Sequence, residues 1–184
     1  LDGTRTSLGH AKGKPNHTGF GVHIALIEDG EPKMGVVYFP ATKEMYFTGN
    51  DNKAYKQIED RPPRPIRPSR PPLRDPLLAA ETFRKEDQQS SIAGRDIEII
   101  PTTGGGRICA AAEGKVDLAI IEKPFSHWDV AAAHAIIRAA GGELVNRDTG
   151  QPLTYDNNDL IAQPSMGASR ETLKLLDISR DLPP

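Results

Sequence analysis

The sequence predicts an α/β protein in which sheets and helices form a layered sandwich, and three features carry this prediction. Residues 20–26 carry apolar side chains at every second position, Phe20, Val22, Ile24 and Leu26, which is the period of a strand with that face buried. Residues 116–121 are almost continuously apolar, as expected of a strand buried on both faces. An alanine-rich helix is expected soon after them, because apolar residues recur at helical spacing from near Ser126 or His127 up to Gly141.

Composition and charge are those of an ordinary globular protein. Of 184 residues, 37% are hydrophobic and 26% are charged, which is enough apolar material for one domain with a core. A net charge of -2 argues against general nucleic-acid binding. The single cysteine, Cys109, excludes an internal disulfide, fits a reducing compartment and lies in an alanine-rich run that favours a core position. No apolar run reaches the roughly 18 residues of a spanning helix, so we expect a soluble, cytoplasmic protein, with peripheral membrane association left open.

The first third of the chain predicts an antiparallel meander. Residues 18–27 form its first strand, and Asp29-Gly30 is a dipeptide that favours a tight hairpin turn. Residues 35–39 and 44–48 are the second and third strands, and a fourth is expected over residues 54–58.

A proline- and arginine-rich segment then divides the chain. Proline fixes φ and supplies no amide donor, so residues 61–72 are expected to be extended and exposed. Such a segment can be a docking site, but we favour a solvated connector. The predicted parts are therefore residues 1–59 with the antiparallel sheet, the connector over residues 60–76, and an α/β part over residues 77–184.

The last part alternates strand and helix signals. Residues 96–100 are a strand, and a glycine-rich run after them enters an alanine-rich helix that stops at Gly114. The other expected elements are a strand over residues 143–146, a turn at residues 148–150, a short strand near residues 160–162 and a helix from Ser169 to about Leu176.

Asp129 is the main candidate functional residue. Ser126 and Asp129 have the spacing of a capping box, with Asp in the place usually taken by Glu or Gln. From this spacing alone, a carboxylate that satisfies first-turn amides is the favoured role. A role as a metal ligand requires a second acidic site.

That second site is the opening run, Leu1-Asp2-Gly3-Thr4. A carboxylate, a glycine and a hydroxyl together suit a metal-assisted phosphate site, although many ordinary turns contain the same residues. The glycine-rich turn around Gly104 and Gly105 precedes a helix, where amides can face a phosphate or a sugar edge. These glycines serve close packing equally well, and the sequence leaves both roles open.

Taken together and in this order, with Trp128 before Asp129 and glycines closing the helix, these motifs resemble the inositol monophosphatase superfamily of Mg2+-dependent, lithium-sensitive phosphatases. The 3'(2'),5'-bisphosphate nucleotidase branch is the most similar. Residues 23–30, 35–40, 112–115 and 150–153 extend the resemblance over nearly the whole chain. It implies the family's layered sandwich of the sugar-phosphatase type. In the family, a portion with a helix layer and a metal-binding Glu comes first, so we expect this chain to be the C-terminal part of a longer phosphatase with the N-terminal part missing.

The resemblance also implies a metal site. Asp2 and Asp129 would be carboxylate ligands of one cation, and the Leu1 carbonyl a ligand of another, in a site with two or three Mg2+ ions. Gly3 and Thr4 would hold the phosphate, and Asp129 would also approach a substrate hydroxyl. The expected catalytic residues are Asp2, Thr4 and Asp129.

The substrate side of the implied site is the glycine-rich turn. Gly104, Gly105 and Arg107 would contact the substrate. Arg107 stands at the position where the family has a Lys and keeps its positive charge. One departure concerns Ala80-Glu-Thr-Phe83, which replaces a Ser-Arg-Ser-His run of the nucleotidase branch and puts the usual specificity in doubt.

The function implied is hydrolysis of a phosphate monoester by metal-activated water, with 3'-phosphoadenosine 5'-phosphate converted to AMP and phosphate. The alternative substrate is myo-inositol monophosphate or another small sugar phosphate. The alternative of a different class is a non-catalytic binding or regulatory module that keeps the fold. The expected partner is thus a small-molecule phosphate monoester and no nucleic acid polymer, and the resemblance is compatible with a homodimer.

Overall fold

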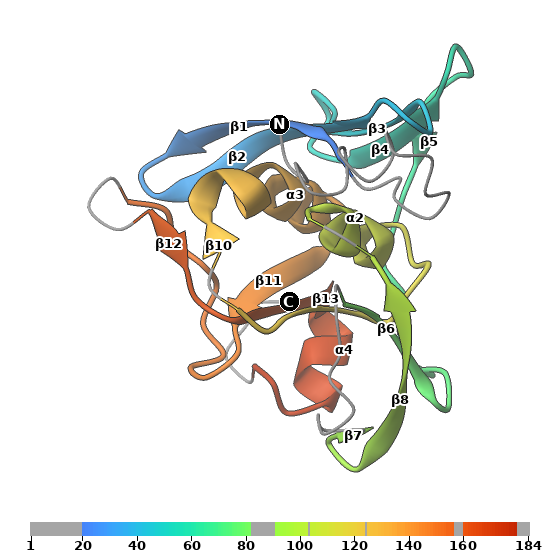
Figure 1. Ribbon diagram of the computed structural model, residues 1–184, viewed down its shortest axis with the longest axis vertical. Helices are drawn as coiled ribbons and strands as arrows, with labels where there is room; N and C mark the ends of the chain where they lie inside the picture. The colour runs from blue at the N-terminus through green and yellow to red at the C-terminus, as the bar shows by residue number, and fades with distance from the viewer. Residues whose placement is uncertain (1–19, 82–90, 103, 124, 157–159, 180–184) are drawn as a thin grey trace, which may run out of the picture.

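The computed structural model describes residues 20–81, 91–102, 104–123, 125–156 and 160–179. These residues form layers (Figure 1): an antiparallel sheet, a layer of two helices, a mixed sheet, and a last helix on the outer face of the mixed sheet. The predicted order of sheet, helices and second sheet is therefore confirmed. No helix within these ranges is long and apolar enough to span a membrane.

The antiparallel sheet is the predicted meander with one added strand. Its strands run in the order β1-β2-β3-β4-β5. Their bounds are Val22–Glu28, Glu31–Phe39, Glu44–Thr48, Ala54–Ile58 and Arg64–Pro65. Asp29 and Gly30 join β1 to β2 with φ of 52° and 75°, and a hairpin turn with two positive φ values is the one that Asp-Gly favours.

The second sheet has six strands in the order β11-β13-β9-β6-β8-β7. The parallel pairs are β6 with β8 and β6 with β9. In chain order the bounds are Leu77–Glu81 (β6), Ser91–Ile92 (β7), Arg95–Pro101 (β8), Leu118–Ile121 (β9), Gly142–Asn146 (β11) and Ser165–Ser169 (β13). Two short strands, β10 (Phe125–Ser126) and β12 (Ile161–Ala162), pair separately. The sequence predicted β8, β9 and β11, but β6 (Leu-Leu-Ala-Ala-Glu) and β13 (Ser-Met-Gly-Ala-Ser) were not predicted, because neither run shows a strand period.

The helices are α2 (Gly106–Ala112), α3 (His127–Ala139) and α4 (Arg170–Leu175). The bounds of α3 agree with the prediction: Ser126 is its N-cap residue, and Gly141, with φ of 94°, follows its C-cap. The predicted capping box is not formed, since the Ser126 side chain makes no capping hydrogen bond. In α4 the corresponding bond is present, because Ser169 Oγ accepts the Thr172 N–H at 3.1 Å.

The main core lies between the two sheets and is centred on α3. Its helix residues from Val130 to Ile137 are buried, and Ile136 and Ile137 are both 0% exposed. A second cluster packs α4 on the outer face of the mixed sheet through Leu173 and Leu176. Cys109 lies in the main core, as predicted, and burial raises the pKa of its thiol.

The helix α3 approaches β2 unusually closely at Gly35. A Cβ added to Gly35 would lie only 2.1 Å from the carbonyl oxygen of Ala132 in α3. The alanines of α3 make the contact possible from the other side, because small side chains let a helix approach a sheet closely. The position of α3 therefore depends on Gly35 in the antiparallel sheet.

Three polar side chains join the layers inside the core. The carboxylate of Glu143 only accepts, so the His134 Nε2–H donates to it at 2.6 Å. His134 Nδ1 is then the acceptor for the Tyr155 hydroxyl at 2.8 Å. The Tyr155 N–H in turn donates to the Gly30 carbonyl at 2.8 Å. This chain of bonds connects α3 to β11 and to the β1–β2 turn.

The proline- and arginine-rich segment is extended, as predicted, but it is more than a solvated connector. It supplies β5, and Ile66 is 4% exposed in the core. The Arg74 guanidinium donates to the buried carboxylate of Asp117 at 2.8 Å, and Arg64 donates to Glu113 at 3.1 Å. Charged side chains therefore anchor the segment to the helix layer and the mixed sheet.

Candidate functional site

Asp129 lies in the first turn of α3, just after the carboxyl end of β9 and the short strand β10. Carboxyl ends of strands in α/β sheets are common positions for ligands. The side chain of Asp129 is partly exposed, and Trp128 beside it is 63% exposed. An acidic group at this end of α3 faces the positive end of the helix dipole. The surroundings therefore suit a carboxylate and leave it accessible to a ligand.

The glycine-rich turn before α2 reaches the same place. A Cβ added to Gly105 would lie 3.3 Å from the backbone carbonyl oxygen of Asp129. Gly104 has a φ of 53°, and Gly105 is the N-cap of α2 and is buried. The structure thus brings together the turn and Asp129, and it shows that both glycines serve the backbone and the packing. Contact of their amides with a ligand stays a prediction.

Arg107 is placed inside the protein. Its side chain is 2% exposed, and its Nε and Nη1 atoms donate to the carbonyls of Gly104 at 3.1 Å and Ile120 at 3.3 Å. The guanidinium also lies 4.6 Å from the ring centre of Phe125. Arg107 therefore ties the glycine-rich turn to β9 and β10. Direct contact of Arg107 with a substrate stays a prediction.

The other predicted ligands, Leu1, Asp2, Gly3 and Thr4, lie outside the described residues, so the proposed pairing of Asp2 with Asp129 stays a prediction. Within the described ranges there is no group of three or more His, Cys, Asp or Glu side chains suited to a metal. Asp129 nevertheless fits a hard cation as one anionic oxygen donor that is partly exposed.

The run Ala80-Glu-Thr-Phe83 is described only in its first half. Glu81 is the last residue of β6 and is 5% exposed, and its carbonyl accepts the Thr102 N–H at 2.9 Å. This bond places the end of β6 beside the segment that leads into the glycine-rich turn. Thr82 and Phe83 lie outside the described residues.

Sequence reasoning missed His23 as a residue of this region. Its ring atoms Cε1 and Nδ1 would lie 2.4 and 3.1 Å from a Cβ added to Gly105. The alternation in this strand predicted the wrong buried face: Val22, Ile24 and Leu26 are exposed, whereas Ala25 and Ile27, on the same face as His23, pack against the core. Because the α3 layer covers the face with the smaller side chains, no local signal indicated that His23 faces inward.

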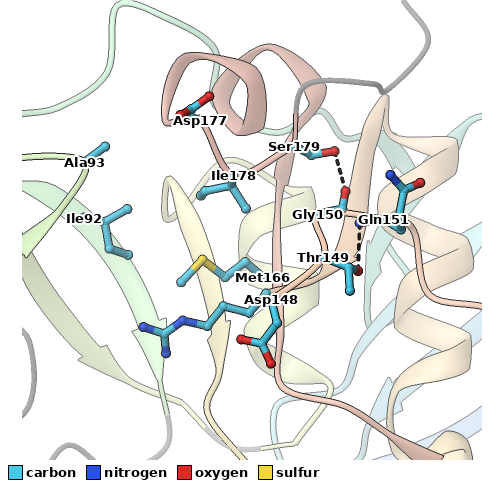
Figure 2. A pocket seen from close by; sticks show the side chains of 11 residues that line it. Ile92, Ala93, Asp148, Thr149, Gly150, Gln151, Met166, Asp177, Ile178 and Ser179 are labelled. Atoms are coloured by element: carbon cyan, nitrogen blue, oxygen red, sulfur yellow. Dashed lines mark hydrogen bonds between the residues drawn. The ribbon is translucent and has the colours of Figure 1, made fainter.

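A separate cavity of about 480 Å3 lies on the mixed sheet, away from these residues. Figure 2 shows its lining around Asp148, Thr149 and Gln151, with Met166 and Ile178 contributing apolar surface. The Arg147 guanidinium also lines it and forms an ion pair with Glu122 at 2.6 Å. Of the predicted site residues that the structure describes, none lines this cavity.

Comparison with known proteins decides the family. The model of the family described as "Inositol monophosphatase family" matches residues 1–180. The chain belongs to the inositol monophosphatase family. The predicted resemblance is therefore confirmed.

Family relatives include enzymes named for different substrates. The chain is 35% identical over 167 residues to the 3'(2'),5'-bisphosphate nucleotidase CysQ of Salmonella typhimurium, a match that covers 89% of this chain and 63% of the relative. It is 31% identical over 177 residues to the inositol-1-monophosphatase ImpA of Mycolicibacterium smegmatis, covering 88% of this chain and 59% of ImpA. The chain thus spans about three fifths of the length of these relatives.

A solved structure supports the fold. The crystal structure of CysQ from Bacteroides thetaiotaomicron, a bacterial member of the inositol monophosphatase family, matches with a TM-score of 0.68 and 28% identity. The match covers 83% of this chain and 64% of the CysQ chain. This likeness and the observed layers confirm the predicted family fold.

Proposed function

We propose that this chain is part of a metal-dependent phosphatase that hydrolyses a small phosphate monoester, with 3'-phosphoadenosine 5'-phosphate as the substrate. The observation that carries the proposal is the convergence of Asp129 and the glycine-rich turn at one point, in a chain of the inositol monophosphatase family. The nucleotidase relative with 35% identity favours the bisphosphate nucleotide.

Asp129 is assigned as a metal ligand that also approaches a substrate hydroxyl. The carboxylate is partly exposed at the first turn of α3, where the helix dipole favours negative charge. Bound Mg2+ would supply a water of lowered pKa and neutralise charge that develops on the phosphate. Leu1, Asp2, Gly3 and Thr4 complete the assignment, with two or three ions per site.

The turn at Gly104 and Gly105 is assigned to the substrate side. Arg107 holds this turn through the Gly104 carbonyl and adds positive charge beneath it. We expect Arg107→Ala to weaken binding of the bisphosphate nucleotide more than binding of inositol phosphate. Equal losses would show that Arg107 and the turn do not recognise the nucleotide, and would favour a sugar phosphate as the substrate.

Two alternatives have specific support. The inositol-1-monophosphatase relative with 31% identity supports inositol monophosphate or another small sugar phosphate. The departure at Ala80-Glu-Thr-Phe83 supports a non-catalytic module that keeps the fold. Rates of phosphate release from both substrates, with and without Mg2+, distinguish the three.

The deciding experiment is Asp129→Asn in the complete gene product. A group that only serves the helix start can be replaced by the isosteric amide at a cost of at most about 1 kcal/mol. A ligand of a hard cation needs the anionic oxygen, so we expect turnover to fall at least about 100-fold while the melting temperature changes by a few degrees.

Glu171→Gln is the matched control for this experiment. Glu171 is also an acidic residue in the first turn of a helix, α4, and its partner there is Arg70 at 3.5 Å. The control should lose as little stability as Asp129→Asn and keep its turnover. Near-normal turnover of Asp129→Asn would return Asp129 to the helix-start role and remove the metal site.

A further inference from the structure

We propose that His23 is a positioning residue, whose imidazole holds the glycine-rich turn of α2 in its place beside Asp129. His23 lies on β1, where it pairs with Val37 of β2. Its side chain is partly buried on the face of the sheet that meets the helix layer, together with Ala25 and Ile27. Hydrophobic packing does not explain an imidazole on the face of the sheet that meets the helix layer, so His23 must have another role.

The first observation is that two glycines enclose the imidazole. An added Cβ would lie 2.4 Å from Cε1 of His23 if it stood on Gly105, and 3.0 Å from Nε2 if it stood on Gly21. Both distances are shorter than Cβ atoms normally show, so the ring occupies the space that side chains at these positions would need. The ring and the glycine backbone are therefore fitted to each other.

The second observation is that the ring has little room to move. The Phe39 ring meets it edge to face, with centroids 6.4 Å apart and planes at 86°. Phe39 itself is 7% exposed and packs on Tyr46 in the same manner. The imidazole is thus held by the sheet and presents a fixed edge to Gly105.

The third observation concerns what Gly105 controls. Its carbonyl accepts the Cys109 N–H at 3.0 Å, so it fixes the first turn of α2. The site of an added Cβ on Gly105 is also 3.3 Å from the Asp129 carbonyl oxygen, in the first turn of α3. Displacement of Gly105 therefore changes the distance between the glycine-rich turn and the first turn of α3, which together form the proposed active site.

These contacts give His23 a consequence for function. A substrate held by the turn and a metal held by Asp129 react only if the two are correctly spaced, and a misplacement of about 1 Å can cost on the order of 100-fold in rate. In this arrangement His23 acts through its contact at Gly105. This consequence rests on the proposed phosphatase function, whereas the contact between His23 and the turn does not.

The first test needs no substrate. In the complete gene product, hydrogen exchange at the Cys109 amide reports on its bond to the Gly105 carbonyl. We expect His23→Ala to speed this exchange at least about tenfold relative to wild type, at a pH where both are folded. Ile24→Ala is the control, because Ile24 is the next residue of β1 but is 64% exposed on the outer face. Unchanged exchange in His23→Ala overturns the proposal.

The second test is a double-mutant cycle on hydrolysis of 3'-phosphoadenosine 5'-phosphate. Gly105→Ala places a methyl group where the imidazole stands, and His23→Ala empties that space. We expect each variant to lower kcat, because it disturbs the spacing of substrate and metal, with a smaller change in KM, and the double variant to have kcat/KM at least about tenfold above the product of the two effects.

Ile24→Ala combined with Gly105→Ala is the control for this cycle. Ile24 is 64% exposed on the outer face of β1, so its effect should simply multiply with that of Gly105→Ala. The positioning role is overturned if the effects of His23→Ala and Gly105→Ala on kcat/KM simply multiply. It is also overturned if the two substitutions couple in melting temperature but not in kcat/KM. A wild-type protein without phosphatase activity refutes the proposed function alone, and the exchange measurement still decides for or against His23.

Discussion

Gly35→Ala should test whether the close approach of β2 to α3 sets the position of the central helix. Gly35 has its N–H bonded to Thr48 Oγ1 at 3.2 Å, so β3 restrains it from one side. From the other side, the added Cβ would lie 2.1 Å from the carbonyl oxygen and 3.0 Å from Cα of Ala132. The obstacle is helix backbone, which no change of rotamer can remove.

The magnitude follows from this geometry. Ordinary contact with a Cβ begins at 3.4 Å, so β2 and α3 must separate by more than 1 Å at this point. Overpacking of a core costs about 1–3 kcal/mol and sometimes more, and we expect the upper end because both elements are fixed. At roughly 2–4 °C per kcal/mol for a chain of this size, the melting temperature should fall by about 6–12 °C.

Thermal and urea denaturation followed by circular dichroism measure this loss. Gly106→Ala is the matched control, because its Cβ would meet its nearest neighbours at 3.4 Å and alanine favours a helix over glycine by up to about 1 kcal/mol. The control should melt at or above the wild-type temperature. If Gly35→Ala melts within about 1 °C of wild type, the layers are not held as closely as the structure shows.

Three further predictions follow from buried polar groups. Arg74→Ala removes the guanidinium from the Asp117 carboxylate, which is 1% exposed and keeps its bond from the Leu78 N–H. The free energy of unfolding, measured by urea denaturation, should fall by about 1–3 kcal/mol. Burial lowers the pKa of His134 below its ordinary 6.5, so the folded state holds the neutral ring and stability should fall as pH drops below about 6.5, measured as the urea midpoint against pH. Cys109 is 1% exposed and burial raises the pKa of its thiol, so a thiol reagent should label the folded protein at least about 100-fold more slowly than the urea-unfolded chain.

Each of these predictions has its own control and its own contrary outcome. Arg61→Ala removes an exposed arginine of the same segment as Arg74 and should be nearly neutral, so equal losses would deny the anchoring role. Replacement of His134 by Gln should reduce the slope of stability between about pH 7 and pH 5.5, and an unchanged slope would place the titration elsewhere. Rapid labelling of Cys109 without denaturant would show that the core opens locally.

Elements with local signals could be predicted from the sequence. The Asp29-Gly30 turn follows from the tolerance of these residues for positive φ, and the strands of the meander follow from their apolar runs. The alternation in β1 nevertheless indicated the wrong buried face, since Val22, Ile24 and Leu26 are exposed. The bounds of α3 follow from its apolar period and from Gly141, and β9 from its continuous apolar run. Asp129 was correctly placed at the start of that helix, and the motifs around it identified the family.

Other elements form only through tertiary contacts with partners far along the chain. The strands β6 and β13 contain small residues without a period, and they become strands because neighbours on both sides supply their hydrogen bonds. The arginines of the connector acquired a role only through buried carboxylates more than 40 residues away, such as Asp117 with Arg74. No local pattern encodes such a pair.

The same distinction holds within the candidate site. Residue types predicted a carboxylate at Asp129 and a flexible turn at Gly105, but their meeting point and the imidazole of His23 beside it depend on three separate layers. Arg107 was assigned to the substrate side from the resemblance, and that contact stays a prediction, whereas its bonds to the carbonyls of Gly104 and Ile120 were visible only in the fold. Charge and spacing specify which chemistry a residue offers, whereas the packing of one layer on another determines whether that chemistry faces the solvent or the core.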